Sequence, residues 1–471
     1  MAVGAAGVTG ADLDDLGSGL RGRLLRPGDD GYDASRAVFN GMIDRRPLAV
    51  ARCADAADVV RAITFVRDHR LRLSVRAGGH NVAGSAVVDD AVMLDLTAMK
   101  ALALDPATRT VRAEPGLTLA EFDAATQASG LATTLGVVSM TGIAGLTLGG
   151  GLGWLNGRHG LACDNLIAAE VATADGRLLR ASADDNEDLF WGIRGGGGNF
   201  GVVTSFEYRL HPVDLVLAGG LTYPLSMAPR VLRFYDEFVK AAPDELSTAA
   251  SLALSPAGEP TVSIVVCYCG PLDQGEQLLR PLRTFQSPTA DSIQPTPYAA
   301  LQSGGDAGFP DGRLHYWKSG YLRDLTDAAI GTLLRFVPSM PSAASGIGLQ
   351  QMHGVASRVP PSATAFPHRA EQYDFLILSQ WPDAAGTQRN VEWTKALFQA
   401  MRPHLEDAVY VNNLGDEGPS RVRAAYGENY PRLLAVKRTY DPDNLFRANQ
   451  NIDPSTDVLP ETRGPASPAP A

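Results

Sequence analysis

The chain has 471 residues, about three times the usual domain length of roughly 150, so one large domain or two to three domains are expected. Hydrophobic residues make up 45% of the chain and charged residues 20%, which excludes a largely disordered chain, a coiled coil and a collagen. The net charge of −11 argues against a broad surface for nucleic acid or anionic membranes. Four cysteines are too few for a disulfide framework, and no secretory leader or membrane-spanning run is visible, so we expect a cytoplasmic protein.

Strand and helix patterns alternate through the first part of the chain. Residues 1–44 are rich in glycine, aspartate and alanine and predict a loosely packed lead-in with one short helix. Thr118 and Glu121 form a capping box, which indicates the start of a helix. Strands are expected at 47–53, 73–80, 92–96, 110–116 and 202–210, a hairpin at 165–182, and helices at 56–70, 119–129 and 184–193.

The character of the sequence changes near residue 215. The following region, 216–424, has fewer glycine tracts, more prolines and alternating stretches, which predict a second domain with an antiparallel sheet and helices. Residues 425–453 are dense in aromatic and asparagine residues, unlike a tail. The last stretch, 454–471, is rich in proline, threonine and serine and is predicted to be disordered.

Glycine makes up 49 of the 471 residues, and three tracts concentrate the excess. The tract at 76–81 follows an expected strand, where adjacent glycines let backbone N–H groups converge on an anion. The tract at 142–153 has six glycines in twelve positions, which would cost a plain helix about 1 kcal/mol each. Its interleaved leucines and tryptophan belong in a core, so a ligand against bare backbone is favoured over a flexible linker.

The third tract, 195–201, contains a literal GxGxxG pattern but not its structural context. A dinucleotide-binding unit needs a strand before the glycines and a helix after them, and here the order is reversed. Cys267 and Cys269 are expected on one strand face as buried apolar residues rather than as metal ligands. The histidines are scattered and no serine sits in a nucleophile elbow, so neither a metal site nor hydrolase chemistry is predicted.

Four motifs together resemble the berberine bridge enzyme-like group of FAD-dependent oxidoreductases, with a flavin domain of the p-cresol methylhydroxylase type. They are RAGGHN, GIAGLTLGGGLGWLNGRHGLACDNL, RGGGGNFGVVTSFEYRL and YGENYPRLLAVKRTYDPDNLF. The resemblance implies an α+β fold in two parts. An FAD-binding domain over 45–215 is completed by the returning segment 425–453, and the substrate-binding domain 216–424 has an antiparallel sheet flanked by helices.

The resemblance also implies FAD with one covalent link, through His80. Val138 stands where doubly linked members have a cysteine, and Cys163 matches a different family position, so we expect no second link. This pattern is similar to relatives that act on 6-hydroxy-D-nicotine. Other residues expected at the cofactor are Arg76, Ala77, Gly78, Gly79, Asn81, Ser85, Val138, Ser139, Thr141, Gly142, Gly145, Gly149, Gly150, Gly201, Val202, Val203 and Asn449.

The catalytic residues depart from the family pattern. Members often use the second tyrosine of a Tyr-x-Asn-Tyr stretch as base, and this chain has Asn413 there, which cannot act as a base. The polar residue that some relatives place before a conserved tryptophan aligns with Leu376. The remaining candidates are Tyr410, Asn412 and Asn413, with Tyr316, Tyr321 and His353 unranked. An amine or activated phenol can also lose hydride without a base.

The implied function is an FAD-dependent oxidase that removes hydride from a C–H/C–N or C–OH centre of a small organic substrate. O2 would reoxidise the flavin and give H2O2, and a polycyclic or alkaloid-like secondary metabolite is favoured over a sugar. Thr141 stands where oxidases commonly have valine, so a dehydrogenase with another acceptor stays open. A flavoprotein that protects its host by binding and redox-cycling a toxic metabolite also stays open. We expect no metal, no nucleic acid and no membrane partner, and a monomer or homodimer.

Overall fold

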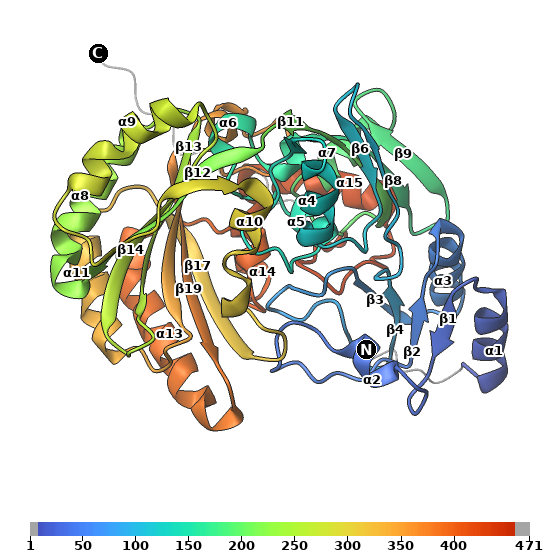
Figure 1. The fold of residues 1–471 in the computed structure, drawn as a ribbon. Coiled ribbons are helices and arrows are strands. Elements are labelled where there is room, and N and C mark those ends of the chain that lie inside the picture. The colour runs from blue at the N-terminus through green and yellow to red at the C-terminus, as the bar shows by residue number, and fades with distance from the viewer. Residues whose placement is uncertain (1–7, 457–471) are drawn as a thin grey trace, which may run out of the picture.

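A computed structural model describes residues 8–456 of the chain. Figure 1 shows two lobes, one built from the N-terminal part of the chain and the other from its middle part. No helix within residues 8–456 is long and apolar enough to cross a membrane. The expected disordered tail, 454–471, falls outside the described residues apart from its first three positions.

The first lobe contains two main sheets (Figure 1). In the first sheet, with order β1-β2-β4-β3, the last three strands are parallel and β1 is antiparallel. The second sheet is antiparallel, with order β5-β6-β10-β8-β9, and a short β11-β7 pair lies apart from it. The strands are β1 (Arg23–Leu25), β2 (Ala49–Arg52), β3 (Arg72–Arg76), β4 (Ala91–Asp95), β5 (Leu102–Asp105), β6 (Thr110–Ala113), β7 (Leu131–Ala132), β8 (Leu166–Ala172), β9 (Leu178–Ser182), β10 (Val202–Arg209) and β11 (His211–Pro212).

Helices of this lobe begin where the sequence signals place them. The Asp55 carboxylate accepts hydrogen bonds from two backbone N–H groups at the start of α3 (Ala56–Asp68). The capping box of Thr118 and Glu121 is present at the start of α4 (Leu119–Gln127). Helix α7 (Glu187–Ile193) precedes the third glycine tract and β10 follows it, so the order of elements excludes a dinucleotide-binding unit, as expected.

The lead-in is more ordered than the sequence predicted. It contains α1 (Gly10–Gly19), β1 and α2 (Tyr32–Arg36), and β1 joins the first sheet as an edge strand. Leu13 and Leu16 of α1 are buried in the same core cluster as residues of α3. The prediction of a loose lead-in with one helix was wrong, because its few apolar side chains reach a core built by later residues.

The second lobe is built on an eight-stranded antiparallel sheet, which confirms the expected antiparallel sheet flanked by helices. Its order is β15-β12-β14-β13-β18-β19-β17, with β16 beside β12. The strands are β12 (Leu215–Pro224), β13 (Leu246–Leu254), β14 (Pro260–Tyr268), β15 (Ala290–Asp291), β16 (Gln294–Pro297), β17 (Leu314–Leu322), β18 (Gly346–Met352) and β19 (Gln372–Trp381). Figure 1 shows helices along the outer side of this sheet: α8 (Ala228–Lys240), α9 (Leu272–Thr284), α11 (Asp327–Phe336) and α13 (Thr387–Met401).

The two faces of strand β19 have different surroundings: one packs in the core, and the other belongs to the inner face of the sheet. Tyr373, Phe375 and Ile377 belong to the core cluster that also contains α8, α11 and α13 residues. Successive side chains of a strand point to opposite faces, so the alternate positions 374, 376 and 378 face away from those helices. These positions line a cavity described below.

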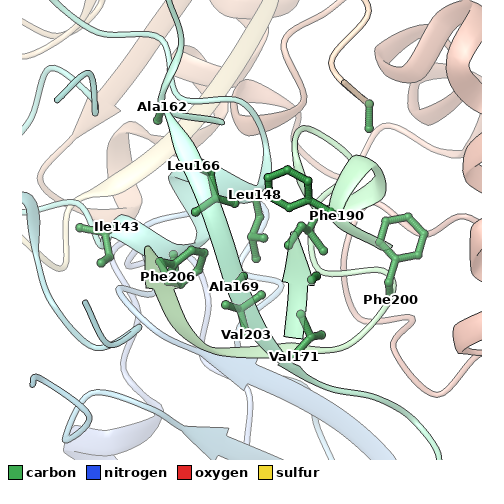
Figure 2. Close-up of a cluster of buried hydrophobic side chains, with 14 of the residues drawn as sticks. Ile143, Leu148, Ala162, Leu166, Ala169, Val171, Phe190, Phe200, Val203 and Phe206 are labelled. Atoms are coloured by element: carbon green, nitrogen blue, oxygen red, sulfur yellow. The ribbon is translucent and has the colours of Figure 1, made fainter. Parts of the chain in front are cut away.

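The chain then returns to the first lobe. Residues of α14 (Pro419–Tyr426) and α15 (Tyr430–Tyr440) join the core cluster around β8 and β10, part of which Figure 2 shows. Lys437 is fully buried, and its ammonium donates to Asp441 at 2.6 Å and to the backbone oxygen of Asn199 at 2.9 Å. The C-terminal segment is therefore bound to the third glycine tract, while the exact domain boundaries stay predictions.

A buried carboxyl group at the contact between the lobes makes stability depend on pH. Asp123 of α4 is 1% exposed and accepts one hydrogen bond, from Gln302 of α10 (Tyr298–Ser303), at 3.3 Å. Burial raises its pKa from 3.8 to about 7. The folded chain therefore binds a proton between these pH values that the unfolded chain does not, and stability falls as pH rises through this window.

We expect Asp123→Asn to gain stability relative to the wild type as the pH is raised from 5 to 8. The gain should reach roughly 2–4 kcal/mol, since three pKa units correspond to about 4 kcal/mol. Urea unfolding at both pH values measures it. An effect of equal size at pH 5 and pH 8 would contradict the assignment.

Candidate functional site

A cavity lies where the two lobes meet, with about 1930 Å³ of atom-free space including its open mouth. One wall is glycine-rich backbone from the loop after β3 and from α5 (Ile143–Leu148). The opposite wall is the inner face of the large sheet, with Trp317, Gln350 and Asp374. Residues 410–413 and 448–450 of the returning chain complete the lining. Segments far apart in sequence thus share one concave site.

Two glycines allow two loops to cross at the first wall. A Cβ on Gly78 would lie 2.5 Å from the backbone nitrogen of Gly142, and a Cβ on Gly142 would lie 2.7 Å from the Cα of Gly78. Both residues line the cavity. The first two glycine tracts are therefore held in backbone contact, which a side chain at either position would prevent.

The second glycine tract serves the protein's own packing more than the sequence suggested. Cβ atoms on Gly149, Gly150 and Gly151 would collide with Asn412, Phe366 and Ala162 respectively. At Gly145, by contrast, a Cβ would meet no atom within 4 Å, and this residue lines the cavity. The expectation that a ligand explains every glycine of the tract is too broad. Gly145 is the clearest position at which open space in the cavity, rather than packing within the protein, accounts for a glycine.

His80 lies at the cavity with one ring nitrogen free. Its ring stacks on Phe39 with centroids 3.8 Å apart, and Phe39 stacks in turn on His315 at 4.3 Å. Its Nε2 is buried and has no hydrogen-bond partner among residues 8–456. Burial lowers the pKa of His80 to about 4, so the imidazole is neutral at physiological pH. A neutral imidazole with a free nitrogen is a competent nucleophile toward a group in the cavity.

Most of the other residues expected at the cofactor line the same cavity: Ala77, Gly78, Gly79, Asn81, Ser85, Val138, Thr141, Gly142, Gly145, Gly149, Gly201, Val202, Val203 and Asn449. Three expected residues are not part of the lining. Arg76 donates to the backbone oxygen of Ser35, and Ser139 donates to the carboxylate of Asp306. Gly150 packs near Phe366, as described above. Their contact with a cofactor stays a prediction, and their observed partners are protein groups.

Tyr410 and Asn412 also line the cavity, but they bind each other and the glycine tract. The Tyr410 hydroxyl accepts hydrogen bonds from the N–H of Gly151 at 2.9 Å, from the N–H of Leu152 at 3.2 Å and from the Asn412 amide at 2.8 Å. Burial raises the pKa of Tyr410 to about 12. These contacts favour a role in holding the loop over one in accepting a proton.

The unranked candidates lie elsewhere. Tyr316, Tyr321 and His353 are outside the cavity lining, and the His353 ring bonds the backbone oxygen of Leu246 at 2.8 Å. Cys163 is fully buried in a separate apolar cluster, and burial raises its thiol pKa. Within residues 8–456 there is no cluster of histidine, cysteine, aspartate or glutamate suited to a metal ion.

Sequence reasoning missed the most polar group on the sheet wall, the carboxyl of Asp374. It is 5% exposed and lies two residues before Leu376 on the same strand face. The available signal was a carboxylate inside an apolar strand, which is rare unless the group has a partner or a function. The alignment with Leu376 drew attention to an apolar position on that face, two residues further along the strand.

Comparisons with known proteins agree with this architecture. Residues 47–182 match the family model described as FAD binding domain, and residues 409–453 match the one described as berberine and berberine like. An FAD-linked oxidoreductase of Dictyostelium discoideum is 30% identical over 447 residues, which cover 94% of this chain and 97% of the relative. The chain belongs to the berberine bridge enzyme-like family of FAD-linked oxidoreductases.

Other members of the family align over nearly their whole length. (R)-6-hydroxynicotine oxidase of Paenarthrobacter nicotinovorans is 32% identical over 450 residues, covering 92% of this chain and 97% of the relative. The crystal structure of 6-hydroxy-D-nicotine oxidase from Arthrobacter nicotinovorans superposes with a TM-score of 0.86 at 30% identity, covering 92% and 98% of the two chains. A chitooligosaccharide oxidase, at 24% identity and a TM-score of 0.85 over 94% and 100% of the two chains, shares the fold.

The residues at the cavity fit the FAD of this family. The backbone crossing of Gly78 and Gly142, the open side of Gly145 and the free Nε2 of His80 lie along one lining. Bare backbone admits a large flat group without collision, and an unpartnered imidazole nitrogen is available beside it. The protein is thus an FAD-linked oxidoreductase, and residues 47–182 match the FAD binding domain of its family.

Proposed function

We propose that the protein is an oxidase that removes hydride from a carbon next to nitrogen or oxygen in a small organic substrate. FAD, when bound, supplies the two-electron acceptor for that hydride, and O2 is proposed as the final acceptor, with H2O2 as product. The proposal is carried by one observation: the cavity joins a glycine-rich backbone wall and His80 to the inner face of the large sheet.

The proposed roles of the chain's own residues follow from their places in the lining. His80 is proposed to hold FAD through a single covalent bond at its free ring nitrogen. The glycine wall would lie against the cofactor, and the sheet wall would place the substrate carbon. Positioning of the two reactants is the largest contribution a protein can make to such a transfer.

Relatives suggest where to begin with substrates. (R)-6-hydroxynicotine oxidase is named for an amine substrate, and it is 32% identical to this chain. The sheet wall carries Trp317, Leu376 and Leu378, which suit an apolar ring better than a sugar. A ring-bearing secondary metabolite is therefore the proposed substrate class.

Anaerobic mixing of the purified protein with ring-bearing amines and alcohols tests the function. Bleaching of the flavin, followed by recovery in air with one H2O2 per turnover, is the expected result. If the bound flavin is reoxidised by an added quinone and not by air, the protein is a dehydrogenase and the proposal of an oxidase is wrong.

Thr141 is the observation that keeps the dehydrogenase as a second candidate. It lines the cavity at the position where oxidases of this family commonly have valine. Thr141→Val has nearly the same volume and removes one hydroxyl. If the wild type reoxidises slowly in air, we expect the variant to reoxidise about tenfold faster, measured by stopped-flow absorbance after anaerobic reduction. If the flavin of the wild type is already reoxidised rapidly in air, the oxidase is the only candidate function of the two that remains.

A further inference from the structure

The carboxyl group of Asp374 has one oxygen bound and one oxygen free. Its Oδ2 accepts a hydrogen bond from the side-chain amide of Asn413 at 2.8 Å. Its Oδ1 is buried without a hydrogen-bond partner among residues 8–456, and the residue lines the cavity. A buried acceptor left unpaired costs roughly 1–3 kcal/mol, so a ligand that donates a proton or hydrogen bond there would recover it.

No cation of the described chain offsets this group. Gln350 lies directly opposite on β18, and its Nε2 is also buried and unpartnered. The titratable groups that face Asp374 are Tyr321 of β17 and Tyr410 of the returning chain, and burial raises the pKa of both. Burial raises the pKa of Asp374 to about 7, against the lowering effect of the Asn413 bond. The carboxyl therefore exchanges its proton close to neutral pH, as a general base requires.

We propose that Asp374 accepts the proton of an alcohol or amine substrate that carries an apolar ring, and that Asn413 is its positioning residue. This inference rests on the proposed function. An alcohol gives its O–H proton to Oδ1 while the C–H bond breaks, the hydride leaves to the FAD, and a C=O bond forms. An ammonium gives its N–H proton to Oδ1 first, and the freed lone pair forms a C=N bond as the hydride leaves.

The surroundings of Asp374 define this substrate class. Leu376 and Leu378 follow it on the same face of β19, and Trp317 pairs with Leu378 from β17. Asp374 and Gln350 are the polar side chains that the β17–β19 part of the sheet contributes to the lining. One polar end beside an apolar strip fits a molecule with an aromatic ring and one ionisable hydroxyl or amine. The Asn413 amide holds Oδ2 and so leaves Oδ1 for the substrate.

Asp123→Asn provides a matched control for Asp374→Asn. Both aspartates are buried, both have a pKa near 7, and both have one side-chain amide donor and a free Oδ1. Asp123 does not line the cavity. The probes are 1-phenylethanol and 1-phenylethylamine, each as separate enantiomers, and the rate of anaerobic flavin reduction is measured in FAD-loaded protein.

We expect Asp374→Asn to reduce its flavin at least about a hundredfold more slowly than the wild type, as loss of a general base implies. Asp123→Asn should keep the wild-type rate, and both variants should keep their FAD. An Asp374→Asn variant that reduces at the wild-type rate would overturn the proposal. If neither probe reduces wild-type protein that contains FAD, the substrate class is wrong, whereas protein without FAD would refute the proposed function instead.

The pH profile separates proton acceptance from a structural role. The wild-type rate should fall below a midpoint near pH 7, because protonated Asp374 cannot accept a proton. Asn413→Leu removes the donor that favours the carboxylate, so its midpoint should move to higher pH. An infrared carboxylic-acid band that titrates near pH 7 and is absent from Asp374→Asn provides a readout independent of turnover. A midpoint that persists in Asp374→Asn contradicts the assignment.

Discussion

Replacing His80 with alanine should remove all acid-stable FAD from the protein. Within the described cavity lining, His80 is the only histidine and there is no cysteine or lysine, so no second nucleophile of these types lies there. The measurement is acid precipitation followed by the flavin spectrum of pellet and supernatant. Wild-type flavin should stay in the pellet, and His80→Ala flavin should move to the supernatant.

Cys163→Ser is the control for this experiment. Cys163 is fully buried in an apolar cluster and is not itself part of the cavity lining, so its loss should leave the covalent link unchanged. Flavin that stays in the pellet of His80→Ala but leaves the pellet of Cys163→Ser would reverse the assignment. Wild-type flavin found wholly in the supernatant would show that FAD is held without a covalent bond.

A leucine at Gly145 should fold and yet exclude FAD. A Cβ at this position meets no atom within 4 Å, and the residue lies inside α5, where glycine is a weak helix former. The added side chain would therefore enter the cavity rather than the core. We expect Gly145→Leu to retain less than about a tenth of the wild-type FAD, since overpacking of this kind costs 1–3 kcal/mol or more.

Gly331→Leu is the matched control for Gly145→Leu. Gly331 lies within α11, and a Cβ there also meets no atom within 4 Å, but the residue is not part of the cavity. The measurements are flavin absorbance per protein and circular dichroism. We expect a loss of flavin in Gly145→Leu but not in Gly331→Leu. Full FAD content in Gly145→Leu, with unchanged helical signal, would place the cofactor away from α5.

Local signals in the sequence predicted much of the fold. The capping residue Asp55 and the capping box of Thr118 and Glu121 begin helices where expected, because a cap depends on residues two or three positions apart. Alternating stretches after residue 215 predicted the antiparallel sheet of the second lobe, and the order of α7, the third glycine tract and β10 excluded a dinucleotide-binding unit. The lead-in could not be predicted in this way, since Leu13 and Leu16 are buried by residues much later in the chain.

The candidate site also contains some residues that local sequence signals predicted and others that only the tertiary structure brings together. The glycine-rich wall was visible in the sequence, because its glycines and the neighbouring His80 lie in continuous motifs whose spacing is itself the signal. Asp374 and Gln350 lie in no such motif, and Asn413 was a candidate only through its place in the Tyr-x-Asn-Tyr stretch. The register of β18 with β19 and the return of the C-terminal chain bring them together.

The amino-acid sequence therefore determined the family, the cofactor and the glycine-rich wall, whose chemistry depends on neighbouring residues. Tertiary structure decided which glycine faces open space and which carboxyl group is buried with one oxygen free. Burial and pairing are properties of contacts between distant segments, and they set the pKa of Asp374 and the freedom of His80 Nε2. A residue's type gives its possible chemistry, and its buried surroundings select the protonation state in which that chemistry is available.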